Sequence, residues 1–164
     1  MNNIFIYNLI HIFFIFIILI FWNNSKMNTF EQFKNNTLLQ KCFSKKDINS
    51  FKKYYKYASI LQTPYSIVYM TPNKYIDDLP QITWNGVFVN NLCIDPKMRN
   101  KGLGTKIILQ IIKKAKKLGY DHIILQADKI NIPANKIYIK VGFKIYSENI
   151  SDDNKVYITY IYYL

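Results

Sequence analysis

The chain has 164 residues, of which 50% are hydrophobic and 16% aromatic, so it can bury one core and we expect a single domain. Its net charge is +12, but the basic residues are nearly all lysine and lie scattered, which argues against nucleic-acid binding. Cys42 and Cys93 lack the spacing of a disulfide framework or a metal site, so we expect a reducing compartment, no metal, and two small packing residues.

The N-terminal segment Ile4 to Trp22 is apolar apart from Asn8 and His11, and at about 1.5 Å per residue it is long enough to cross a bilayer. It has no basic start and no small-residue cleavage site, so the segment fits a cleaved signal peptide poorly. The first lysine is Lys26, and the positive-inside rule would keep the C-terminal globular part in the cytoplasm. Two alternatives stay open: residues 1–26 are a membrane anchor, or Met27 is the true start and 27–164 the whole domain.

The next stretch predicts alternating elements. The short apolar run 37–43 suggests a first strand, and Ser44 with an aspartate three residues later is typical of a helix start. We expect that helix to continue until Pro64 ends it. Residues 65–70 are β-branched and aromatic, which favours a second strand.

Residues 71–80 carry turn-forming side chains and predict a loop. Residues 82–94 then supply one long strand, or two strands joined at Asn85-Gly86, a strong hairpin dipeptide.

The C-terminal half changes period. Apolar residues from Leu103 to Leu118 recur at helical spacing, lysines gather in the last turns, and Gly119 stands where a left-handed cap belongs. Residues 122–127 predict a strand, 133–141 a short helix, and 143–148 and 155–164 two further strands. The order strand, helix, strand implies a parallel crossover.

The loop "RNKGLG", residues 99–104, separates a strand from the long helix. A helix N-terminus offers unpaired N–H groups to an anion, and glycines at 102 and 104 let a diphosphate approach the backbone. A third glycine for a dinucleotide fingerprint is missing, as is the Gly-Lys-Ser/Thr of a Walker loop. Arg99 is the only arginine of the chain.

Two motifs in register indicate what this loop binds. An apolar strand end is followed by a proline and by Arg-x-x-Gly-x-Gly opening the long helix. Downstream lies the pattern Asn-x-x-Ala-x-x-x-Tyr-x-x-x-Gly-Phe, whose members are Asn131, Ala134, Tyr138, Gly142 and Phe143. Residues 92–143 thereby resemble the GNAT superfamily of N-acetyltransferases, while the N-terminal half matches only in the order of its elements.

The resemblance implies an α/β fold of the α+β type, with a mixed, mostly antiparallel sheet, a central splayed pair of parallel strands and flanking helices. It implies acetyl-CoA as co-substrate and an unidentified primary amine as acceptor. Tyr138 would be the catalytic acid that protonates the leaving thiolate. The implied cofactor-binding residues are Cys93 and Ile94 for the pantetheine arm, Arg99, Asn100, Lys101, Gly102, Leu103, Gly104 and Thr105 for the diphosphate, and Asn131.

The general base is not identified. Many relatives carry a glutamate within residues 82–94, where this chain has Asn90 and Asn91. Four aspartates are weak candidates, since each resembles a turn or capping residue, and a water relay would leave no pattern. These are Asp77, Asp78, Asp95 and Asp128. His122 begins a strand far from the reacting carbon and is interpreted as structural.

Two rival functions stay open. The segment 90–103 also faintly resembles the N-terminal half of protein N-myristoyltransferases, which suggests a different acyl-CoA, but those chains are much longer and the glycines favour acetyl-CoA. The other rival is a catalytically inactive binding module that keeps the fold and is tethered to a membrane. Tyr138 and an open acceptor cleft would argue for an enzyme.

Overall fold

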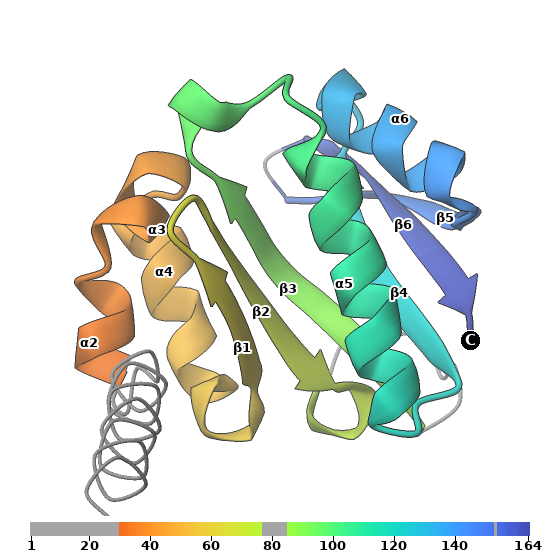
Figure 1. Cartoon of the computed structure of the whole chain (residues 1–164), viewed down its shortest axis with the longest axis horizontal. Coiled ribbons are helices and arrows are strands. Elements are labelled where there is room, and N and C mark those ends of the chain that lie inside the picture. The colour runs from red at the N-terminus through yellow and green to blue at the C-terminus, as the bar shows by residue number, and fades with distance from the viewer. Residues whose placement is uncertain (1–29, 77–84, 153) are drawn as a thin grey trace, which may run out of the picture.

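The computed structural model describes residues 30–76, 85–152 and 154–164, which form a six-stranded sheet with helices on both faces (Figure 1). The strand order across the sheet is β1-β2-β3-β4-β6-β5. The strands are β1 (Ser59–Thr63), β2 (Ser66–Pro72), β3 (Gly86–Ile94), β4 (His122–Asp128), β5 (Lys144–Ile150) and β6 (Val156–Tyr163). The helices are α2 (Phe30–Lys34), α3 (Thr37–Cys42), α4 (Lys45–Ser50), α5 (Leu103–Lys117) and α6 (Ile132–Val141), with 3-10 turns η1 (Phe51–Lys53), η2 (Tyr55–Tyr57), η3 (Asn73–Tyr75) and η4 (Pro96–Met98).

The central strands β3 and β4 are parallel, but they pair only over their first halves. The register joins Gly86–Val89 to His122–Leu125 and stops there, while every other neighbouring pair in the sheet is antiparallel. At the point of divergence β3 has a bulge: Tyr69 faces Asn91 and Met70 faces Val89, so Asn90 is the extra residue. The predicted fold class, a mixed sheet with a splayed parallel pair, is confirmed.

Two apolar cores hold the layers together. The larger core lies between the sheet and the pair α5 and α6, and includes Val87, Val89, Ile108, Ile111 and Tyr138. The smaller core lies under α3 and α4 on the opposite face. It contains Leu38, Leu39, Ile48, Phe51, Ile67, Tyr69 and Cys93. The alternation of β2 side chains between the two cores shows that both faces of the sheet are buried there.

Helix α5 forms where the helical period predicts it. Ile107, Ile108, Ile111 and Ala115 face the core, and Gly119 follows the helix with a φ of +77° that few other residues adopt. Three lysines lie in the last turn, where cations favour the negative end of the helix dipole. The lysine-rich end of this helix therefore needs no ligand to explain it.

The prediction of a strand at 37–43 is wrong, because this segment is helix α3. The Asn36 side chain accepts hydrogen bonds from the backbone N–H groups of Leu38 (2.9 Å) and Leu39 (3.2 Å), which starts a helix. The two leucines are then buried on one side of it. A run this short carries no period, so its apolar character alone could not distinguish the two structures.

The long helix predicted from Ser44 to Pro64 is wrong beyond its first turns. The Ser44–Asp47 capping box is present and α4 begins there, but the chain passes through two 3-10 turns and becomes strand β1. Pro64 lies in the hairpin between β1 and β2, where the Thr63 and Ser66 hydroxyls are 2.7 Å apart. The proline marks a turn rather than a helix end.

The N-terminal segment 4–22, residues 82–84 of the predicted strand, and two of the aspartate candidates, Asp77 and Asp78, lie outside the described residues. Within the described ranges, none of the helices has both the length and the apolar character that crossing a membrane requires.

Candidate functional site

The divergence of β3 from β4 opens a cavity of about 380 Å³ toward α5 and α6. One wall comes from the end of β3, one from the loop that precedes α5, and one from the first turns of α6. The lining residues are Leu92, Ile94, Met98, Arg99, Asn100, Gly102, Leu103, Gly104, Ile108, Asn131, Pro133, Ala134, Ile137 and Tyr138. An apolar wall with a few polar groups at its rim is typical of a small-molecule site.

The N-terminus of α5 faces this cavity. Gly102 adopts a φ of +75°, and a Cβ built on it would meet nothing within 4 Å. The first helical hydrogen bond runs from Lys106 N–H to the Gly102 carbonyl at 3.2 Å, so the three N–H groups between them lack partners within the helix. Within the described chain, this end therefore offers open space and unpaired donors to an anion.

Gly104 serves a different purpose from Gly102. A Cβ on Gly104 would come within 2.7 Å of the Ile137 methyl group and 3.6 Å of that of Ile94. This glycine therefore allows α5 to approach α6 and the end of β3. Close packing of these elements sets the width of the cavity.

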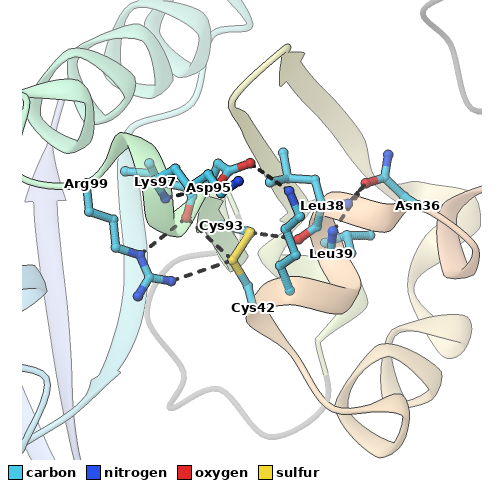
Figure 2. Close-up of a disulfide and its surroundings, with 10 residues drawn as sticks. Asn36, Leu38, Leu39, Cys42, Cys93, Asp95, Lys97 and Arg99 are labelled. Carbon is cyan, nitrogen blue, oxygen red and sulfur yellow. Dashed lines mark hydrogen bonds and ion pairs between the residues drawn. A yellow bond between two sulfur atoms is a disulfide. The ribbon is translucent and has the colours of Figure 1, made fainter.

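Arg99 stands at the rim of the cavity. Its Nε donates to the Ile94 carbonyl oxygen at 3.3 Å, and its Nη2 lies 3.8 Å from Sγ of Cys42 (Figure 2). The side chain is exposed, so its remaining donors are open to a bound anion.

Tyr138 of α6 lines the cavity and is 8% exposed. Burial, with a smaller contribution from Tyr160, raises the pKa of Tyr138 to about 12. The hydroxyl therefore keeps its proton over the physiological range. Asn131 caps α6, because its side-chain oxygen accepts from the Ala134 N–H at 3.4 Å, and the residue also faces the cavity.

Most of the residues implied by the motifs come together here. Ile94, Arg99, Asn100, Gly102, Leu103, Gly104, Asn131 and Tyr138 all line the cavity. Three predicted residues are not among its lining: Cys93, Lys101 and Thr105. Lys101 is exposed, with Nζ 3.8 Å from the Met98 sulfur, while Thr105 lies in the first turn of α5. For Lys101 and Thr105 the motif predicts contact with the diphosphate through the backbone N–H groups, not through the side chains.

The interpretation of Cys42 and Cys93 as free packing residues is wrong, because they form a disulfide that joins α3 to β3 (Figure 2). Cys93 is buried in the smaller core, on the face of β3 opposite the cavity. The two Cα atoms are 5.8 Å apart although 51 positions separate them in the chain. Only the fold brings them together, so spacing gave no signal.

Neither described aspartate candidate is placed as a general base. Asp95 accepts from Lys41 Nζ (2.8 Å) and from the Lys97 N–H, and these bonds hold its pKa below the ordinary value. Asp128 caps a turn by accepting from the Ile130 N–H at 3.0 Å. Each thus has the capping role that its sequence context indicates.

His122 is buried, and one of its ring nitrogens lies 2.9 Å from the side-chain nitrogen of Asn73. Burial lowers the pKa of His122, so the ring stays neutral. His122 is the backbone partner of Tyr163 in β6, at the end of β4 where β4 is still paired with β3. This placement is structural.

Sequence reasoning missed the apolar walls of the cavity. Leu92, Met98 and Ile108 flank the loop, and Pro133 and Ile137 come from α6. Within α6, Pro133, Ile137 and Tyr138 recur at helical spacing, a signal that could have marked one face of this helix as a wall.

Known proteins resemble this chain in sequence. Residues 75–143 match the sequence profile described as the Acetyltransferase (GNAT) family. A curated relative, the uncharacterized N-acetyltransferase YvbK of Bacillus subtilis (strain 168), is 36% identical over 59 residues. That match spans 36% of this chain and only 38% of the relative's length.

Solved structures are similar over most of the chain. The ribosomal-protein-S18-alanine N-acetyltransferase of Escherichia coli has a TM-score of 0.60 at 16% identity, covering 84% of this chain and 90% of that one. A Bacillus subtilis acetyltransferase in complex with CoA has a TM-score of 0.56 at 20% identity, covering 77% and 88%. These likenesses establish the fold. The motifs and the profile match show that residues 75–143 are similar to the GNAT acetyltransferase family.

Proposed function

We propose that the protein transfers an acetyl group from acetyl-CoA to a primary amine. The observation that supports this most directly is the cavity beside the diverging end of β3, which is lined by the open N-terminus of α5 and by Tyr138 of α6. The Bacillus subtilis acetyltransferase of similar fold was solved in complex with CoA. The acceptor amine stays unassigned.

The residues present fit such a ligand. Unpaired N–H groups after Gly102, together with Arg99, would hold the diphosphate. The edge of β3 beyond Val89 pairs with no described strand on the β4 side, so its backbone groups could bond the pantetheine amides. Leu92, Ile94 and Ile137 would shield the thioester from water. Cys93 would contribute backbone alone.

The thioester supplies an activated acetyl group with a thiolate leaving group. Tyr138 keeps its proton at neutral pH and would donate a hydrogen bond to the sulfur as charge develops there. A pKa of about 12 exceeds that of an ordinary thiol, near 8.5, so stabilisation of the thiolate by hydrogen bonding is favoured over complete proton transfer. The amine must arrive neutral, and its proton would leave through water.

Binding of acetyl-CoA is tested by calorimetric titration into the full-length chain, and transfer by acetyl-CoA consumption with a panel of primary amines. Gly102→Val would place a side chain in the open space of the cavity and should abolish binding. Gly119→Val is the matched control, because Gly119 has nearly the same φ (+77° against +75°) and the same open surroundings at the other end of α5. Both variants force a valine to a similar positive φ, so a difference in acetyl-CoA affinity between them reports contact with the ligand.

The proposal predicts binding by the wild type and by Gly119→Val, and a loss of at least about a hundredfold in Gly102→Val. A folded wild-type chain that binds no acetyl-CoA would contradict the proposal and would favour the inactive binding module. Binding that falls equally in both glycine variants would show that strain, not a ligand at Gly102, is responsible. Tighter binding of a longer acyl-CoA would identify a different donor.

A further inference from the structure

The disulfide lies directly behind two residues of the cavity. Nη2 of Arg99 approaches Sγ of Cys42 to 3.8 Å, and Nε of the same side chain donates to the Ile94 carbonyl at 3.3 Å (Figure 2). That carbonyl is also 3.6 Å from the Cys42 sulfur. Arg99 and Ile94 both line the cavity, whereas the disulfide does not. The sulfur pair therefore contacts the rim of the site from outside it.

The disulfide also fixes the free end of β3. Beyond Val89 this strand has lost its partner β4 and keeps only β2, with a bulge at Asn90. The bond from Cys93 to Cys42 ties this half of the strand to α3, which packs on the opposite face. The disulfide thus holds this half of β3 in place where hydrogen bonding to β4 is missing.

We propose that the Cys42–Cys93 disulfide is a positioning element of the cavity, which orients Arg99 and the end of β3 so that the oxidised chain binds acetyl-CoA more tightly than the reduced chain. The inference rests on the proposed function, since acetyl-CoA is the ligand whose diphosphate Arg99 would hold. Neither cysteine side chain lines the cavity.

Reduction would change what Arg99 contacts. A dithiol reductant gives up two electrons and becomes a cyclic disulfide, while the bond between Cys42 and Cys93 breaks and each sulfur gains a proton. The Cys93 thiol then finds an acceptor in the Leu38 carbonyl, 3.2 Å away. The Cys42 thiol would donate to the Ile94 carbonyl, 3.6 Å away, in competition with Nε of Arg99. Arg99 would thereby lose the contact that holds its side chain at the rim of the cavity.

Two measurements on the full-length chain test this. The first is calorimetric titration of acetyl-CoA into the oxidised chain and into the reduced chain, freed of dithiol under argon. The second is the reduction potential of the pair in dithiothreitol mixtures, read by maleimide labelling with and without acetyl-CoA. We expect the oxidised chain to bind acetyl-CoA about tenfold more tightly. Because ligand binding and disulfide reduction are thermodynamically linked, saturating acetyl-CoA should then make the reduction potential of the disulfide more negative by about 30 mV.

Variants separate this role from general support of the fold. In Arg99→Ala both redox forms should bind weakly and most of the difference between them should disappear, because the cavity residue that contacts the sulfur is gone. Lys97→Ala removes a nearby positive charge that does not contact Cys42 and should keep the redox dependence. The Cys42→Ser/Cys93→Ser double variant should match the reduced chain. If that variant fails to fold, the potential of the wild type alone decides.

Equal affinity of the two redox forms, or a potential that acetyl-CoA does not shift, would overturn the inference and leave the proposed function intact. Redox dependence that persists in Arg99→Ala would overturn the assigned route through the guanidinium. If neither redox form binds acetyl-CoA, the proposed function falls and this inference with it.

Discussion

Tyr138→Phe removes the hydroxyl of a residue that lines the cavity and leaves the ring in place. The aromatic contacts with Phe143 and Tyr160, at centroid distances of 6.0 Å and 5.4 Å, should persist. If the hydroxyl acts on the leaving sulfur, kcat should fall by about a hundredfold while the affinity for acetyl-CoA stays within about twofold. Calorimetry gives the affinity, and acetyl-CoA consumption with an accepted amine gives kcat.

The structure also gives a magnitude that does not depend on an acceptor. The folded-state pKa of Tyr138 lies at about 12, above its unfolded value of 10.0. The protonated hydroxyl therefore stabilises the folded chain fully below pH 10, and this contribution is lost as the pH rises from 10 to 12. With these two values, the loss is about 1.4 kcal/mol at about pH 11.

Urea unfolding at about pH 8 and pH 11 measures this loss, and the difference between the wild type and Tyr138→Phe isolates it from other tyrosines that burial also perturbs. The variant should lose about 1.4 kcal/mol less than the wild type over this interval. An identical alkaline loss in both proteins would refute the assigned burial of the hydroxyl. A kcat unchanged in the variant would refute its role at the sulfur.

Three further perturbations have defined outcomes. Reduction of Cys42–Cys93, which closes a loop of 51 positions, should lower stability by about 4 kcal/mol and Tm by about 10 °C in calorimetric scans, and an unchanged Tm would argue that the bond is absent in solution. Because burial holds the pKa of His122 below 6.5, stability in urea should fall as the pH drops below 6.5, and His122→Gln should lack this fall. Gly86→Ala would drive a methyl group into the His122 ring and the Asn73 amide, and should cost about 1–3 kcal/mol in urea unfolding; a neutral effect would contradict this packing.

The C-terminal half could be predicted from the sequence because its elements are long and marked at both ends. Helix α5 runs through four turns of apolar period and ends at a glycine with positive φ, and α6 opens with Asn131 and a proline. The N-terminal half has helices of five or six residues, too short to show a period. There the capping residues Asn36 and Ser44 mark where α3 and α4 begin, and the sequence pattern predicts only the helix start at Ser44.

The residues of the candidate site also divide into those that the sequence could predict and those whose role depends on the assembled fold. Motif spacing identified Arg99, Gly102 and Tyr138 because the loop and α6 are regular enough for residue order to fix position. The role of Gly104 in helix packing depends on the approach of Ile137, which only the assembled fold defines. The disulfide depends in the same way on α3 reaching β3 across the sheet.

The short pairing of β3 with β4 divides the sheet into two halves. Four residue pairs join β1-β2-β3 to β4-β6-β5, against seven pairs between β4 and β6, so the two halves are hydrogen-bonded to each other at one end only. A ligand bound to both halves of the sheet would hold them together, and at a concentration of a hundred times its Kd it would add about 2.7 kcal/mol to the free energy of unfolding. If that ligand is the proposed acyl donor, the resistance of the folded chain to heat and proteases would then depend on the donor concentration.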